Sequence, residues 1–192
     1  MIEVKEKIHR IMAPRLTFLI GTVSEKGVKN IIPISNVTSI STEPGMVIMA
    51  VYVEWVTCAN LRKAKGFTMS LPSKNQLELV WKLGPKYSGY NSGFEKDVEF
   101  KDSLDTNFSP YGPVLKGAIG WIECDIVDFP KDVGGNHLMV IGKYKKAMVD
   151  PKQYTSEITP IGNPKPIMQW ERNNFSTAAD IFSIEYFKDP GF

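Results

Sequence analysis

Hydroxyl and amide side chains gather in one short segment, where they could hydrogen-bond a small polar ligand. The segment runs from Ser35 and Asn36 through Thr42, and six of its eight residues are Ser, Thr or Asn. Such a composition can also satisfy its own backbone as a polar turn, through Asx and ST turns. The sequence leaves both readings open, and the polar turn is the commoner of the two.

Thr57 is a second candidate for ligand binding. We predict that it is the N-cap of a short helix over residues 57–64, where the first backbone N–H groups lack helical partners. With Arg62 and Lys63 close behind, this helix start is suited to a phosphate group. Most such threonines only cap a helix.

His137 is a third candidate. Gly134-Gly135-Asn136 precede it and a predicted strand follows, which places an imidazole at a loop-to-strand junction. Histidine can accept or donate a proton near neutral pH. It can equally be a turn residue without a chemical role, and the residues alone do not separate these alternatives.

Several kinds of chemistry lack their sequence motifs. The chain contains no G-x-G-x-x-G, no G-x-x-x-x-G-K-[ST] and no G-x-S-x-G. Its two cysteines, Cys58 and Cys124, form no C-x-x-C pair, and it has only two histidines, which disfavours a zinc or iron–sulfur site. Redox chemistry would therefore depend on an organic cofactor.

Composition narrows the classes of partner. The 192 residues carry 23 Lys+Arg against 21 Asp+Glu, a net charge of +2, which does not indicate nucleic-acid binding. The longest apolar run, Met46–Val53, is far shorter than the roughly 20 residues of a membrane-spanning helix. The N-terminus lacks the continuous apolar region of a signal peptide, so we expect a cytoplasmic protein.

Apolar periodicity and turn residues predict mainly strands. The predicted strands are residues 15–23, 28–34, 45–53, 66–71, 114–129, 138–149 and 181–187. Short helices are expected before Pro14 and after a capping box at residues 73–76. Residues 86–113 and 150–174 are expected to be irregular, and a β-bulge is expected near Ile126–Val127. The continuously apolar Met46–Val53 is expected to be covered on both faces, either inside a barrel wall packed by other elements or at a subunit interface.

A set of short motifs, each weak alone, stands in a specific order. These are Pro14, Asn30, Ser35-Asn36, Glu43-Pro44, Thr57 with Asn60, and Gly135-Asn136-His137 ahead of Gly142. Over roughly Met12 to Val149 this order and spacing resembles the flavin reductase-like, FMN-binding split-barrel family, which includes flavoredoxin.

The resemblance implies a mainly β fold, a six-stranded antiparallel Greek-key split barrel with a few short helices, forming one domain over residues 1–192. It further implies FMN as cofactor, NADH or NADPH as electron donor, and a homodimer with FMN near the subunit interface. The implied activity is that of an NAD(P)H-dependent flavin reductase. A non-enzymatic FMN electron carrier is the alternative, and a split barrel that has lost its flavin is a third hypothesis.

The resemblance also implies site residues. Asn36 and Val37 would lie along the isoalloxazine, Thr57 would hold the phosphate region, and the loop 88–96 would close over the cofactor. His137 would lie near the flavin or the nicotinamide as the catalytic residue. The full implied cofactor-binding set is Ser35, Asn36, Val37, Thr57, Cys58, Asn60, Leu71, Ser92, Lys96 and His137, with no metal ligand. Asn136 stands where many relatives carry Asp, so this imidazole lacks a negatively charged neighbour.

Overall fold

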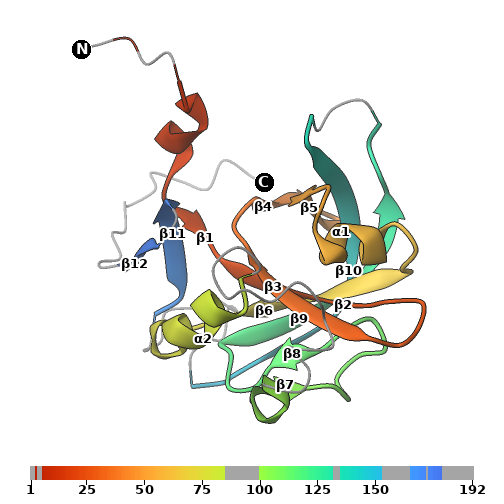
Figure 1. Cartoon of the computed structure of the whole chain (residues 1–192). Coiled ribbons are helices and arrows are strands. Elements are labelled where there is room, and N and C mark those ends of the chain that lie inside the picture. Colours follow the sequence, from red (N-terminus) through yellow and green to blue (C-terminus); the bar gives the residue numbers. More distant parts are fainter. Residues whose placement is uncertain are drawn as a thin grey trace, which may run out of the picture.

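A curled antiparallel sheet of seven strands organises the chain as a split barrel (Figure 1). The computed structural model describes residues 3, 6–84, 100–131, 135–152, 165–171 and 173–178. The strand order is β3-β2-β6-β9-β10-β5-β4. The strands are β2 (Phe18–Val23), β3 (Lys29–Ile34), β4 (Val37–Thr42), β5 (Gly45–Tyr52), β6 (Gly66–Leu71), β9 (Gly120–Asp128) and β10 (His137–Val149).

The mainly β prediction is confirmed, and the count of six strands is one short. The extra strand is β4, which occupies the segment whose composition favoured a polar turn. It pairs with β5 and leaves most of its side chains exposed or half-buried. Because β4 lies at the edge of the sheet, it needs no apolar alternation, and the run of hydroxyl and amide residues at its start is equally typical of a turn.

Strand β5 has one buried face rather than two. Val47, Met49 and Val51 are buried, whereas the residues between them are only half-buried. Elements of the same chain therefore cover only one face, and the alternative, that a subunit interface covers the other face, stays a prediction. The reason is the alternation of side chains across an antiparallel strand, which the uniformly apolar sequence hides.

Two predicted strands are each divided. Residues 15–23 form β1 (Arg15–Leu16) and β2, and residues 114–129 form β8 (Val114–Leu115) and β9. Gly117, with φ of 67°, lies between β8 and β9 in a conformation that glycine adopts readily. The predicted bulge is confirmed, because Asp128 and Ile126 face the consecutive residues Ile141 and Gly142.

The segments expected to be irregular contain further strands. β11 (Ile167–Glu171) and β12 (Asn174–Thr177) join β1 in a separate three-stranded sheet. Among the described residues of the 86–113 segment, η3 (Lys101–Ser103) leads into β7 (Leu104–Asp105), which pairs with β8. The β1–β11 pairing connects distant parts of the sequence, so no local pattern signals it. The strand predicted at 181–187 lies outside the described residues.

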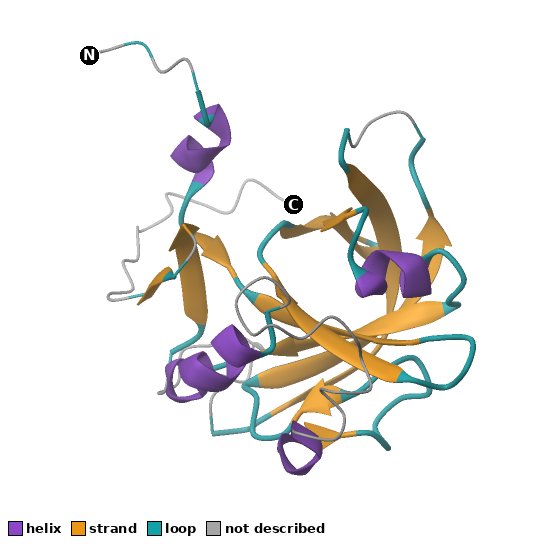
Figure 2. Ribbon diagram, viewed as in Figure 1, coloured by secondary structure: helices purple, strands orange, loops and turns teal. Residues whose placement is uncertain are grey.

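The helices are short and lie around the strands (Figure 2). Besides η3, the described residues form η1 (Ile8–Met12), α1 (Val56–Leu61), η2 (Lys74–Gln76) and α2 (Leu77–Lys82). The capping box before α2 is confirmed, and in it the Ser73 backbone N–H donates to Gln76 Oε1 at 3.1 Å. The first helix is present as a single 3₁₀ segment with no buried residue. Within the described residues, no helix is long and apolar enough to cross a membrane.

Candidate functional site

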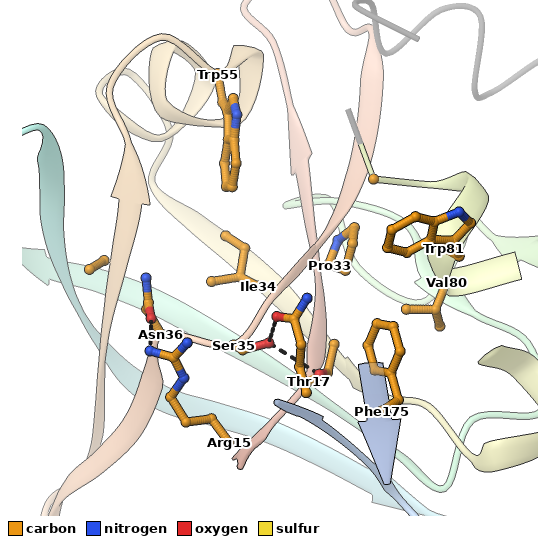
Figure 3. A pocket seen from close by; sticks show the side chains of 13 residues that line it. Arg15, Thr17, Pro33, Ile34, Ser35, Asn36, Trp55, Val80, Trp81 and Phe175 are labelled. Atoms are coloured by element: carbon orange, nitrogen blue, oxygen red, sulfur yellow. Dashed lines mark hydrogen bonds between the residues drawn. The ribbon is translucent and has the colours of Figure 1, made fainter. Parts of the chain in front are cut away.

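A cavity of about 230 Å³ lies where the end of β3 meets β1, the start of α1, α2 and the β11–β12 hairpin (Figure 3). It is lined by residues that span most of the sequence. They are Arg15, Thr17, Pro33, Ile34, Ser35, Asn36, Ala50, Trp55, Val80, Trp81, Gly84, Gln169 and Phe175.

One part of the cavity wall is aromatic and aliphatic. Ile34 and Val80 contribute aliphatic surface, and Trp55 contributes an indole. Trp81 and Phe175 meet edge to face, with ring centroids 6.3 Å apart and planes at 86°. Such a wall is suited to a planar ring.

The other part of the wall is a polar end with directed hydrogen bonds. Ser35 Oγ donates to Gln169 Oε1 at 2.8 Å. Because this hydroxyl proton is used, the 3.1 Å contact with Thr17 is one in which Thr17 Oγ1 donates to Ser35 Oγ. Beside this row, Arg15 Nη1 donates to Asn36 Oδ1 at 2.9 Å.

Arg15 gives this polar end a positive charge. Among the described residues that line the cavity it is the only charged one. Its Nε is buried and has no hydrogen-bond partner. This nitrogen has no accessible surface, so a molecule in the cavity does not reach it.

The structure brings two of the predicted cofactor residues, Ser35 and Asn36, to the cavity. Val37 follows directly as the first residue of β4 and packs against the main core cluster. These three residues lie where the chain passes from β3 to β4. The sequence signal for them, polar residues directly after a buried strand, was informative.

Thr57 has a different local role from the predicted one. The N-cap of α1 is Trp55, so Thr57 lies inside the helix, fully buried. Its Oγ1 accepts a hydrogen bond from Asn30 Nδ2 at 2.6 Å, and Asn60 Nδ2 donates to Thr22 Oγ1 at 3.0 Å. The N-cap prediction is therefore wrong: these two bonds anchor α1 to β3 and β2, which holds Trp55 at the cavity.

Two further predicted cofactor residues, Cys58 and Leu71, do not line the described cavity wall. Cys58 is fully buried in the main core cluster. Leu71 is buried at the end of β6, where its carbonyl accepts the Ile119 N–H at 2.8 Å. Ser92 and Lys96 lie outside the described residues.

His137 lies at the start of β10, outside the described cavity wall. Its ring meets Tyr52 edge on at 5.7 Å, and Tyr52 meets Trp55 at 5.9 Å, so two ring contacts connect it to the cavity. Its Nδ1 lies 2.7 Å from Asn136 Oδ1, an oxygen that only accepts, so the proton is on Nδ1 and Nε2 keeps a lone pair. Desolvation lowers the pKa of His137 below its ordinary value, which makes the imidazole neutral at pH 7.

Sequence reasoning missed most of the cavity wall. The sequence predicted Arg15 and Thr17 only as strand residues and Gln169 only as part of the irregular segment 150–174, and it assigned no binding role to Trp81 or Phe175. Arg15 carried a faint signal, because a charge stands directly before a buried strand. Gln169 and Phe175 had none, since they reach the cavity only through long-range strand pairing.

Comparison with known proteins agrees with this architecture. Residues 11–177 match the flavin reductase like domain family, and the chain belongs to that family. An uncharacterized protein of Pyrococcus abyssi is 31% identical over 136 residues, which are 70% of this chain and 74% of that protein.

Solved structures share the fold at low identity. An FMN-binding protein from Thermus thermophilus, solved with bound 1-cyclohex-2-enone, has a TM-score of 0.78 at 18% identity, covering 96% of this chain and 98% of that one. An NADH:FAD oxidoreductase from Streptomyces globisporus has a TM-score of 0.71 at 16% identity, covering 94% and 99%. The resemblance found in the sequence is thereby confirmed at the level of family and split-barrel fold.

Proposed function

We propose that this flavin-related oxidoreductase binds FMN at the cavity and acts as an NAD(P)H-dependent flavin reductase. The observation that supports it is the cavity itself, with aromatic walls and a polar end of hydrogen-bond donors in a chain of the flavin reductase like family. When bound, FMN supplies the ability to accept a hydride, which no side chain provides. A cavity of about 230 Å³ takes part of its ring system, so the rest of FMN would extend beyond it.

Different residues are proposed to act on different parts of FMN, according to their positions. Ser35, Asn36 and Val37 are proposed to contact the isoalloxazine, because the first two line the cavity and the third adjoins them. Thr57 and Asn60 are proposed to act on the phosphate region by fixing α1, since their side chains are bonded to the sheet.

The other predicted contacts remain part of the proposal on the strength of the family resemblance. They are Cys58, Leu71, Ser92 and Lys96 as further cofactor contacts. His137 is proposed to orient the nicotinamide or accept a hydrogen bond through Nε2, because a neutral imidazole with its proton on Nδ1 has that nitrogen available. Because the imidazole is neutral at pH 7, we do not propose His137 as a general acid at that pH.

A homodimer is proposed from exposed apolar surface. The half-buried face of β5 and the exposed Ile40, Val53 and Val56 would be covered by a second copy. The whole chain is proposed to act as one FMN-binding domain in the cytoplasm, drawing on NADH or NADPH.

The test starts with the protein purified and titrated with FMN, followed by flavin absorbance and calorimetry. Binding followed by bleaching with NADH or NADPH over many turnovers supports the reductase. Bound FMN that accepts electrons from a redox protein but never from a nicotinamide supports the electron carrier instead. Protein that remains colourless and binds no added FMN refutes both. Light scattering at micromolar concentration tests the dimer, and a monomeric mass counts against it.

A further inference from the structure

The hydrogen bond from Arg15 fixes which way the Asn36 amide faces. Because Arg15 Nη1 can only donate, its partner on Asn36 is the oxygen, and the amide nitrogen is turned away from Arg15. Figure 3 shows that nitrogen on the side of Asn36 opposite the guanidinium. Asn36 therefore offers N–H donors to the cavity, while its acceptor is already used.

The positive charge of Arg15, like the Asn36 N–H donors, favours a ligand that carries hydrogen-bond acceptors. No acidic side chain in the described part of the chain forms an ion pair with it, and no other charged residue lines the described cavity wall. This end of the cavity is thus complementary to a molecule whose edge carries acceptors and negative charge.

Flavin acquires such an edge when it is reduced. Two electrons and one proton, equivalent to one hydride, convert the neutral ring of FMN into an anion whose charge lies along N1 and the C2 carbonyl oxygen. We infer that Arg15, by its charge and by orienting Asn36, makes this site bind reduced FMN more tightly than oxidised FMN. The inference rests on the proposed function, because it requires flavin in this cavity.

Two other roles for Arg15 predict different results. If Arg15 paired with the phosphate of FMN, it would strengthen binding of both redox states and would not affect riboflavin, which lacks the phosphate. If it only supported the local fold of β1 against β11, its loss would weaken binding of both redox states equally. Only recognition of the ring anion changes the ratio between the two states.

The experiment measures dissociation constants for oxidised and dithionite-reduced flavin, under anaerobic conditions, with the full chain. FMN and riboflavin are each titrated into the wild type, Arg15→Gln, Arg15→Lys and Asn36→Asp. The control is Arg10→Gln, which removes an exposed guanidinium of η1 that does not line the cavity. Circular dichroism and thermal unfolding establish that each variant is folded.

We expect Arg15→Gln to reduce the preference for reduced flavin by about tenfold or more, for FMN and riboflavin alike. For a two-electron couple, tenfold corresponds to a potential about 30 mV lower, which a spectroelectrochemical titration measures directly. Arg15→Lys keeps the charge and retains most of the preference. Asn36→Asp places a carboxylate against Arg15 and loses the preference although Arg15 is intact.

An unchanged ratio in Arg15→Gln overturns the inference, whether both affinities fall together or neither falls. An effect on FMN that is absent with riboflavin also overturns it, because it assigns Arg15 to the phosphate. Failure of the proposed function looks different: the wild type then binds neither FMN nor riboflavin in either redox state.

Discussion

Replacing Thr57 with Val tests whether α1 is held by a buried polar bond. Valine has nearly the same shape as threonine but cannot accept the hydrogen bond from Asn30 Nδ2, which is 2.6 Å long in the wild type. Both side chains are buried, at 0% and 3% exposure, so water cannot replace the lost acceptor. The substitution therefore leaves a buried amide N–H unsatisfied.

The expected cost follows from that unsatisfied donor. An unsatisfied buried polar group destabilises the folded state by about 1–3 kcal/mol. For a chain of this size each kcal/mol lowers Tm by about 2–4 °C, so a central cost of about 2 kcal/mol predicts a fall of about 4–8 °C. Removing both partners, with Asn30→Leu and Thr57→Val together, is expected to cost less than the sum of the single changes.

Urea and thermal unfolding of the four proteins in this double-mutant cycle provide the assay. Thr38→Val, at an exposed position of β4, is the matched control and is expected to change Tm little. If Thr57→Val unfolds at the wild-type temperature, or if the double variant is simply additive, the buried bond does not hold α1. FMN titration of the same variants tests the proposed effect on the phosphate region, because loss of the anchor should weaken FMN binding in protein that is still folded.

Three further changes test other parts of the structure. Gly142→Ala would place a Cβ 2.7 Å from Phe67 Cζ, so we expect a loss of about 1–3 kcal/mol in urea unfolding, and wild-type stability would contradict this packing. The Tyr111 hydroxyl, 2.6 Å from Asp125 Oδ1, is the largest cause that holds the pKa of Asp125 below its ordinary 3.8. Tyr111→Phe should raise that pKa in an NMR titration. The variant should also lose free energy of unfolding relative to the wild type, in full at neutral pH and less as pH falls through the native pKa of Asp125. A loss that does not change with pH would exclude this linkage. His137 should titrate below pH 6.5 by NMR, because desolvation lowers its pKa in the folded state. The unfolded chain then binds the proton more readily than the folded chain does, so the contribution of His137 to the free energy of unfolding should decline as pH falls below 6.5. A titration midpoint above 6.5 would contradict the desolvation of His137.

The parts of the fold that the sequence predicted are those governed by local pattern. Strands β3 and β6, the bulge beside Gly142 and the capping box at Ser73 each follow from alternation, turn residues or capping chemistry within a few positions. The family resemblance supplied the overall architecture, and Ser35 and Asn36 at the cavity follow from polar residues at the end of a buried strand.

The parts that were missed depend on contacts between distant segments. Arg15 pairs with Gln169 across the β1–β11 sheet, which brings two cavity residues together over more than 150 positions of sequence. The role of Thr57 in α1 depends on Asn30, its hydrogen-bond partner in strand β3. A threonine at a helix start looks the same in the sequence whether its hydroxyl faces solvent or an asparagine of the sheet.

The cavity wall runs from Arg15 to Phe175, so it is complete only after the β11–β12 hairpin has docked onto the rest of the fold. A ligand held there would contact residues on both sides of the docking interface and would therefore stabilise the docked hairpin. By mass action, occupancy at a hundred times the Kd would add about 2.7 kcal/mol to the docked form. Proteolytic resistance of the hairpin should therefore rise with flavin concentration, and a chain cut back to residue 165 should lose its affinity for flavin.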